Sequence, residues 1–354
     1  MKILVVDDSI VFRSQISASL SGVENMEVVG TAPNGRIAIQ KLQQFQVDLI
    51  TLDMEMPELN GLDTIKEIKR LGLKTKIIVF SSQTIRGAEK ALEALAAGAD
   101  DVVAKPSADN LDFTKAQKMI EEALIPRVRQ FLMASTRVSH IPKKSEPRAV
   151  TSSGASKDKK NLKSFFPKAV VIASSTGGPT ALETIFKQLK CVPKYPIFIV
   201  QHMPPVFTHI LAKRLSDMAG IPVHEATHGQ RVESGHTYLA PGGFHMLIEK
   251  DRDGLVIKLN EEPYRNSVRP AADFLFESAG AIFKHQLLGV VLTGMGEDGA
   301  VGAKAIHELG GGIIIQDQAS CVVFGMPGAV FINDDYDDIM NLTEITDYLR
   351  TVIV

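Results

Sequence analysis

The sequence of 354 residues has little cysteine, little net charge and no long apolar run. Its two cysteines, Cys191 and Cys321, are too few for a disulfide framework, so we expect a reducing compartment. A formal net charge of −2 gives no reason to expect nucleic acid or a membrane surface as the main partner. No apolar run approaches the roughly 18 residues of a membrane span, and the N-terminus enters a predicted strand rather than a signal peptide. We therefore expect a cytoplasmic protein without membrane insertion.

Length and composition are those of an ordinary globular protein. Hydrophobic residues make up 45% and charged residues 23%, and the length is enough for two domains with separate cores. We expect a first domain over residues 1–125, a helix end and flexible linker over 126–164, and a second domain over 165–354. The small, polar and charged residues before position 164 predict the linker. A basic docking tract, containing Lys143-Lys144, is the alternative interpretation of this segment.

The first domain alternates short β-branched runs with segments of helical periodicity. Such alternation predicts right-handed crossovers and a parallel sheet covered by helices on both faces, here a flavodoxin-like (βα)5 domain. The predicted strands are Lys2–Val6, Glu27–Gly30, Asp48–Leu52, Lys76–Phe80 and Asp101–Ala104, with helical patterns such as Gly35–Phe45 and Gly61–Leu71 between them.

Acidic residues stand where the predicted strands of this domain end. Asp7, Asp8 and Asp53 should meet at the carboxyl edge of the sheet, where their charges repel unless a cation neutralises them. The set favours Mg²⁺ beside a carboxylate nucleophile, which is chemistry suited to phosphoryl transfer. Lys105 supplies a further positive charge, and Ser81 a hydroxyl that can turn toward a new phosphate. The sequence therefore predicts a phosphate-operated switch.

Residues 1 to about 125 resemble a response-regulator receiver domain. The likeness lies in the acidic pair Asp7 and Asp8, in Ser81 and Lys105, and in one loop. The segment of that loop is Asp53-Met54-Glu55-Met56-Pro57-Glu58-Leu59-Asn60-Gly61. The resemblance implies a phosphoacceptor at Asp53, switch residues Ser81 and Lys105, and a Mg²⁺ site made by Asp7, Asp8, Asp53 and the backbone carbonyl of Glu55.

The second domain resumes the same alternation and predicts a doubly wound, mostly parallel α/β fold. An antiparallel strand pair should flank the turn at Asp251–Gly254. The other predicted strands are Ala169–Ala173, Ile197–Gln201, Tyr238–Ala240, Leu287–Leu292 and Gly312–Gln316, and the predicted helices follow Gly178, Pro205, Pro270, Gly299 and Leu342.

Three residues that could act together in acyl transfer follow strands of this domain. Ser175 lies in a small-residue turn, His202 ends an apolar strand, and Asp298 lies in a glycine-rich turn. Serine, histidine base and orienting acid are the parts of a hydrolytic triad if the strand ends converge. The turn around Ser175 alone fits a phosphate-binding loop equally well, because backbone N–H groups that open a helix hold any anion.

The second domain resembles the catalytic domain of chemotaxis protein-glutamate methylesterases. The resemblance implies that Ser175 is the nucleophile, His202 the general base and Asp298 its partner, with Thr176 and Met295 as oxyanion or substrate candidates. Ser174 is a rival nucleophile, since a second hydroxyl stands beside Ser175. The segments that carry the likeness are Ala173-Ser174-Ser175-Thr176-Gly177-Gly178, Gln201-His202-Met203-Pro204-Pro205, Tyr238-Leu239-Ala240-Pro241-Gly242-Gly243, Leu292-Thr293-Gly294-Met295-Gly296 and Phe324-Gly325-Met326-Pro327.

The two resemblances together imply a phosphorylation-activated esterase in chemotaxis adaptation. It would hydrolyse glutamate γ-methyl esters on chemoreceptors, deamidate receptor glutamines, and receive phosphate from a chemotaxis histidine kinase. We expect a monomer whose esterase site needs no cofactor and which binds no nucleic acid. The alternative is a phospho-switched binding module without turnover. A DNA-binding regulator is not supported, because no basic recognition helix is present.

Overall fold

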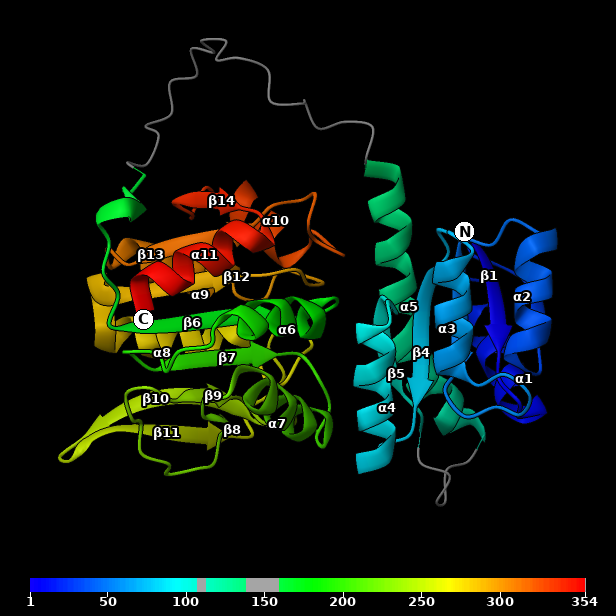
Figure 1. Ribbon diagram of the computed structural model, residues 1–354, viewed down its shortest axis with the longest axis horizontal. Helices are drawn as coiled ribbons and strands as arrows, with labels where there is room; N and C mark the ends of the chain where they lie inside the picture. The colour runs from blue at the N-terminus through cyan, green and yellow to red at the C-terminus, as the bar shows by residue number, and fades with distance from the viewer. Residues whose placement is uncertain (107–112, 138–158, 354) are drawn as a thin grey trace, which may run out of the picture.

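The structure is a computed structural model that describes residues 1–106, 113–137 and 159–353. Two parallel sheets, each with its own helices, lie side by side in the described chain (Figure 1). Most of the predicted linker, residues 138–158, lies outside the described residues, as do 107–112 and 354.

The first sheet has five parallel strands in the order β2-β1-β3-β4-β5. Its central strands are continuous apolar runs because helices cover both faces of the sheet. The strands are β1 Lys2–Val6, β2 Glu27–Ala32, β3 Leu49–Asp53, β4 Lys76–Ser81 and β5 Asp101–Ala104. The helices are α1 Ile10–Leu20, α2 Gly35–Gln44, α3 Gly61–Arg70, α4 Ile85–Ala96 and α5 Phe113–Arg137.

Four helices of this domain begin at a side-chain cap that the sequence supplies. In each, the capping oxygen accepts the N–H three residues further along, which satisfies one of the free amides at the helix start. The caps are Ser9 for α1, Asn34 for α2, Asn60 for α3 and Thr84 for α4. These caps fix the residue at which each helix begins.

The second sheet has seven parallel strands in the order β14-β13-β12-β6-β7-β9-β8. A separate antiparallel hairpin, β10 His245–Asp251 with β11 Gly254–Asn260, packs beside it. The strands are β6 Ala169–Ser174, β7 Ile197–Gln201, β8 Val223–Glu225, β9 Thr237–Leu239, β12 Leu287–Val291, β13 Gly312–Gln316 and β14 Asp338–Met340. The helices are α6 Gly178–Gln188, α7 Phe207–Ala219, α8 Ala272–Phe283, α9 Ala300–Glu308, α10 Met326–Ile332 and α11 Leu342–Ile353, with short 3-10 turns η1 Leu162–Ser164 and η2 Lys284–Gln286.

The predicted fold class is confirmed for both sheets, and so is the predicted hairpin. The sequence patterns did not predict three short elements, β8, β14 and α10. Each of the two strands has three residues and lies at an outer edge of the sheet, where too few residues repeat to give a periodic signal.

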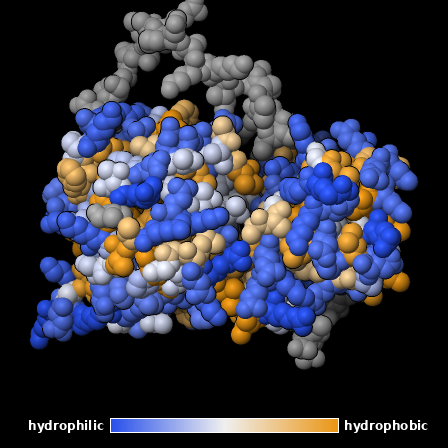
Figure 2. Space-filling view, in the orientation of Figure 1, coloured by the Kyte–Doolittle hydropathy of each residue, from blue (hydrophilic) through white to orange (hydrophobic). Residues whose placement is uncertain are grey.

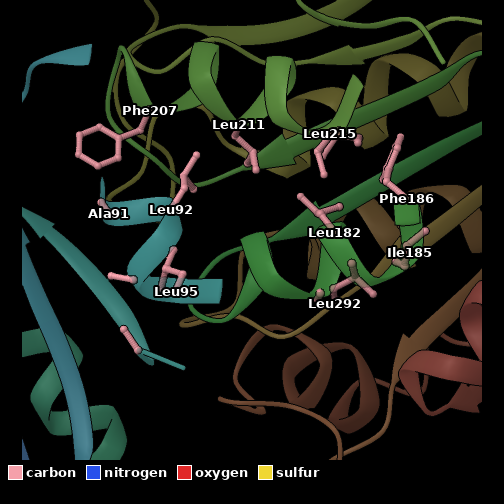
Figure 3. Close-up of a cluster of buried hydrophobic side chains, with 14 of the residues drawn as sticks. Ala91, Leu92, Leu95, Leu182, Ile185, Phe186, Phe207, Leu211, Leu215 and Leu292 are labelled. Carbon is pink, nitrogen blue, oxygen red and sulfur yellow. The ribbon is translucent and has the colours of Figure 1, made fainter. Parts of the chain in front are cut away.

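Apolar side chains join the two domains. Helix α4 packs against α6 and α7 (Figure 1). Figure 3 shows Leu92 and Leu95 of α4 beside Leu182 of α6 and Phe207 and Leu211 of α7, and all five are buried. These side chains form one continuous hydrophobic cluster, so the two domains share part of their core.

In contrast to the apolar junction between the domains, most of the surface seen in Figure 2 is covered by hydrophilic residues. None of the helices in the described ranges has both the length and the apolar character needed to traverse a bilayer.

Candidate active site

Ser175 and His202 are held side by side by the pairing of their strands. Ser174 of β6 pairs with Gln201 of β7, and the His202 amide donates to the Ser174 carbonyl at 3.1 Å. Ser175 and His202 each follow directly after this last pair. Since neighbouring strands lie about 4.8 Å apart, the two residues leave the sheet next to each other.

The turn that carries Ser175 is fixed by its backbone. The Ser175 amide donates to the Thr293 carbonyl at 3.0 Å, and the Ser175 carbonyl accepts from the Gly178 amide at 2.8 Å. Gly177 adopts a φ of 78°, in the left-handed region that favours glycine. A side chain at Gly294 would place its Cβ only 2.9 Å from the Ser175 Cβ. The small residues predicted around the serine therefore allow the two loops to approach each other.

Ser174 and Ser175 have different surroundings. Ser174 is fully buried, and its hydroxyl donates to the Gln201 side-chain oxygen at 2.7 Å. The Gln201 amide nitrogen in turn donates to the Ser175 carbonyl at 3.0 Å. Ser175 is only half-buried. The structure thus favours Ser175 over Ser174 as the residue that faces a substrate.

His202 and Asp298 form a buried pair. The His202 Nε2 lies 2.7 Å from Asp298 Oδ2, with side chains 8% and 2% exposed. Burial alone would raise the pKa of Asp298. The hydrogen bonds from His202 and from the amides of Ala272 and Asp273 lower it by more, so the pKa of Asp298 lies below its ordinary value. Asp298 is therefore ionised and accepts the Nε2 proton. This leaves Nδ1 of His202 as the basic nitrogen, whereas in the serine protease triad the acid binds Nδ1.

No hydrogen bond joins the Ser175 hydroxyl to His202 within the described residues. Catalytic hydrogen bonds are often long until substrate is bound, and a serine hydroxyl has three staggered χ1 positions to choose from. The structure thus brings together His202 and Asp298, the predicted base and acid, and places Ser175 beside them on the neighbouring strand.

Thr176 and Met295 occupy the two loops beside Ser175. Within the described residues, no hydrogen bond engages the backbone N–H of either one, so both amides are available to an oxyanion. The Thr176 side chain has a different partner, because its hydroxyl donates to Asp101 Oδ2 of the first domain at 2.8 Å. Arg127 of α5 contacts the same carboxylate oxygen at 3.1 Å.

The acidic cluster of the first domain surrounds a lysine. Lys105 Nζ lies 2.8 Å from both Asp7 Oδ2 and Asp53 Oδ1. Burial raises the pKa of Asp53 and Lys105 lowers it in part, with a net pKa above the ordinary value. In the described residues, Asp7, Asp8 and Asp53 are the one set of three or more possible ligands whose atoms lie within 4.8 Å of each other. Carboxylate oxygens fit a hard divalent cation.

The predicted switch residue Ser81 and the predicted metal-site residue Glu55 both have side chains that contact α4. The Ser81 hydroxyl donates to the Gly87 carbonyl in the first turn of α4 at 2.7 Å. The Glu55 carboxylate, which is exposed, pairs with Lys90 of α4 at 2.5 Å, while the Glu55 backbone N–H bonds to Asp53. The side chain of Glu55 is thus engaged away from the acidic cluster, and only its backbone is close to it.

Sequence reasoning missed several residues that hold the site. Gln201, Asn266 and Asp273 contact the loops of Ser175 or Asp298, and Asp101 contacts Thr176 across the domain junction. Gln201 alone had a visible signal, because it is an amide at the end of a strand that is otherwise apolar. The others become neighbours only through loop conformation and domain packing.

Comparisons with known proteins match both halves of the chain. Residues 170–349 match the family model described as CheB methylesterase, and residues 3–116 match the response regulator receiver domain. A Trichodesmium erythraeum protein named protein-glutamate methylesterase/protein-glutamine glutaminase is 42% identical over 98% of this chain and 97% of its own length. A Nocardioides protein of the same name is 42% identical over 93% of this chain and 89% of its own. The crystal structure of the Thermotoga maritima CheB methylesterase catalytic domain is 40% identical, with a TM-score of 0.51, and covers 52% of this chain and 98% of that chain.

Proposed function

Since the chain belongs to the CheB methylesterase family and carries a response regulator receiver domain, we propose that it is a serine esterase controlled by phosphorylation. Its substrates are glutamate γ-methyl esters on chemoreceptors, and the double name of its relatives supports glutamine deamidation by the same site. The observation that carries the proposal is the buried His202–Asp298 pair beside Ser175 on adjacent parallel strands.

The proposed reaction begins with proton transfer from the Ser175 hydroxyl to Nδ1 of His202. The serine oxygen attacks the ester carbonyl, and the amides of Thr176 and Met295 hold the oxyanion. Asp298 stabilises the imidazolium, which then protonates the leaving methoxide, so methanol departs and an acyl-enzyme remains. Water, deprotonated by His202, hydrolyses this intermediate to glutamate. With glutamine the same steps release ammonia instead of methanol.

Phosphorylation is assigned to Asp53 of the receiver domain, with a chemotaxis histidine kinase as donor. The oxygens of Asp7, Asp8 and Asp53, with the Glu55 carbonyl, would hold Mg²⁺, which offsets the negative charge of the incoming phosphoryl group. Lys105, already between two of these carboxylates, supplies a further positive charge to the phosphate.

The switch is proposed to work through α4 and β5. A phosphate on Asp53 would attract the Ser81 hydroxyl away from the Gly87 carbonyl, and so release the first turn of α4. Helix α4 contributes Leu92 and Leu95 to the domain junction. The same phosphate would draw Lys105, which follows the strand that carries Asp101. Both movements weaken the packing of the receiver over the Thr176 loop.

The domain division is also proposed, with a receiver over 1–125, a connecting segment over 126–164 and a catalytic domain over 165–354. The two separate sheets and the matched ranges 3–116 and 170–349 support it. Helix α5 continues to Arg137, so the connecting segment begins inside a helix. We propose a cytoplasmic monomer, and the free thiols of Cys191 and Cys321 support a reducing compartment.

The decisive experiment measures methanol released from methylated receptor fragments by the whole protein, with and without a small phosphodonor. We expect turnover that the donor increases, and loss of turnover in Ser175→Ala and in His202→Ala. A serine-reactive probe should label Ser175 only when His202 is intact. Receptor binding without methanol release, under both conditions, would instead support a binding module.

A further inference from the structure

Helices α8 and α9 begin side by side, and each lacks a capping side chain of its own. The N-cap residues are Ala271 for α8 and Gly299 for α9, and neither makes a side-chain cap. Free amides at the start of a helix need acceptors when they are buried. Both helix starts must therefore find acceptors elsewhere.

The acceptors are exchanged between the two helices. Asp298, just before α9, accepts from the α8 amides of Ala272 at 2.6 Å and Asp273 at 3.2 Å. Asp273, in the first turn of α8, accepts from the α9 amides of Gly299 at 3.0 Å and Gly302 at 2.7 Å. Each aspartate thus caps the helix of the other. The Asp298 carboxylate is consequently oriented by the same contacts that lock α9 against α8.

Asn266 links the two carboxylates. Its Nδ2 donates to Asp273 Oδ2 at 3.0 Å and to Asp298 Oδ1 at 3.3 Å. Asn266 has a φ of 53° and Ser267 one of 63°, and an asparagine tolerates this left-handed conformation better than most residues. Arg265 Nε lies 3.4 Å from Asp273 Oδ2, so the guanidinium supplies positive charge to a carboxylate that is 0% exposed.

We propose that Asp273 and Asn266 are positioning residues, which fix the Asp298 carboxylate against Nε2 of His202 for the esterase reaction. This inference rests on the proposed function. In the described residues Asp273 makes no hydrogen bond to Ser175 or His202, so its influence passes through Asp298 and the start of α9. Four oriented donors, namely His202, two amides of α8 and Asn266, determine where the Asp298 oxygens lie. Loss of the Asp273 carboxylate removes the acceptor of two amides at the start of α9, and loss of Asn266 leaves Asp298 Oδ1 with the Asp273 amide as its remaining donor.

The test compares kcat and KM for the whole protein, with phosphodonor, in Asp273→Ala, Asn266→Ala and the same changes combined with Asp298→Ala. We expect kcat to fall about ten- to a hundred-fold for Asp273→Ala and several-fold for Asn266→Ala, with KM changed less than about two-fold, because misplacement by about 1 Å costs up to a hundred-fold. In the Asp298→Ala background, each change should lower the residual kcat by less than about two-fold, because residues that act as a unit are not additive.

The matched control is Asp337→Ala. Asp337 is another buried carboxylate of this domain, 1% exposed, and accepts from the Ile313 and Lys160 amides at 2.8 Å each, remote from Ser175. It should lower the melting temperature without lowering kcat. If Asp273→Ala does not fold, Asn266→Ala decides the matter.

Two results would overturn the inference. One is an unchanged kcat in folded Asp273→Ala or Asn266→Ala, and the other is an equal loss of kcat with and without Asp298. Failure of the proposed function would look different, because wild type and Ser175→Ala would then release methanol at the same rate.

Discussion

The hydroxyl of Thr176, the residue after the proposed nucleophile, donates a 2.8 Å hydrogen bond to Asp101 of the receiver domain. Asp101 belongs to β5, and the next residue after this strand is Lys105, which pairs with Asp7 and Asp53. One strand therefore contacts the Thr176 loop at its start, and the residue just past its end contacts Asp53, the proposed phosphoacceptor. This connection offers the most direct test of how the two domains communicate.

The first prediction concerns Asp101→Ala without phosphodonor. It removes a charge-assisted hydrogen bond across the junction, whose net worth is about 1.5–3 kcal/mol when buried and less at this half-buried position. We expect the basal rate of methanol release to rise a few-fold and the activation by phosphodonor to shrink. Asp63→Ala on α3, which removes a surface partner of Lys66, is the control and should change neither rate. An unaltered basal rate in Asp101→Ala would show that this bond does not restrain the esterase.

The second prediction concerns the catalytic domain without its receiver. Residues 159–354 should release methanol faster than the unphosphorylated whole protein, because α4 no longer packs on α6 and α7. The fragment starts at Lys159 so that Lys159 and Lys160 keep their contacts to Asp334 and Asp337. The T. maritima catalytic domain was solved separately, which supports folding of this part alone. Equal rates for fragment and whole protein would count against inhibition by the receiver.

Much of this site could be predicted from sequence because parallel strands deliver their carboxyl ends to one edge. Ser175, His202 and Asp298 each follow an apolar run, and the structure has those runs as β6, β7 and β12 of one sheet. The sequence could not predict how the side chains of His202 and Asp298 are oriented relative to each other. The pairing of Asp298 with Nε2 rather than Nδ1 of His202 depends on how the Asp298 loop meets α8, and that loop has no periodic pattern.

Contacts between elements were harder still to predict. Asp101 reads as an ordinary acid at a strand start, and only the packing of α4 against α6 and α7 brings it to Thr176. Asp273 likewise reads as a favourable acid in the first turn of its own helix. Its second use, as a cap for α9, requires the two helices to begin at the same point in space.

The third prediction concerns Asp53→Asn and pH. Burial raises the pKa of Asp53 above its ordinary value despite Lys105, so the folded receiver holds the proton more tightly than the unfolded chain does. Stability due to this group is therefore greatest in acid and is lost as pH rises through the folded pKa. We expect Asp53→Asn to melt about 2–4 °C higher than wild type at pH 7, the shift that a gain of about 1 kcal/mol in the free energy of unfolding produces. The difference should disappear below about pH 4, where Asp53 is protonated in both states.

Calorimetric melting of both proteins from pH 3 to pH 7 would check this. Glu24→Gln, a change at an exposed carboxylate of the same domain, should melt like wild type throughout. A lower melting temperature for Asp53→Asn at pH 7 would mean that the attraction of Lys105 outweighs the cost of burial.

The fourth prediction concerns Asp298→Asn. Without the carboxylate, His202 loses both its orientation and its counter-charge, and we expect kcat to fall by up to about ten-thousand-fold with little change in KM. The pKa of Asp298 is lowered in the folded state, so its stabilisation is present above about pH 4 and is lost as pH falls through the folded pKa. The melting temperature of Asp298→Asn should thus lie below wild type at pH 7 and approach it in acid. Glu297→Gln, an exposed neighbour, is the control, and a similar kcat loss there would contradict a specific role for Asp298.

The fifth prediction separates the two adjacent serines by means of Gln201. The Gln201 side chain accepts from the Ser174 hydroxyl and donates to the Ser175 carbonyl, and both Ser174 and Gln201 are buried. Ser174→Ala leaves one acceptor of Gln201 unpaired, at a cost of about 1–3 kcal/mol, but keeps the Ser175 loop in place. We expect it to melt a few degrees lower and to retain most of its kcat, whereas Ser175→Ala abolishes turnover.

Gln201→Leu should lower activity more, because it leaves the Ser174 hydroxyl and the Ser175 carbonyl without this partner and loosens the loop that carries the proposed nucleophile. We expect kcat to fall about ten- to a hundred-fold, as a displaced nucleophile requires. Adding Ser174→Ala to Gln201→Leu should recover part of the melting temperature, since removing both partners costs less than removing one. It should not recover kcat, because the contact to the Ser175 carbonyl stays lost. If the double variant regained full activity, the role of Gln201 would be to satisfy Ser174 alone, and the Ser175 loop would be held by its backbone bonds to Thr293 and Gly178.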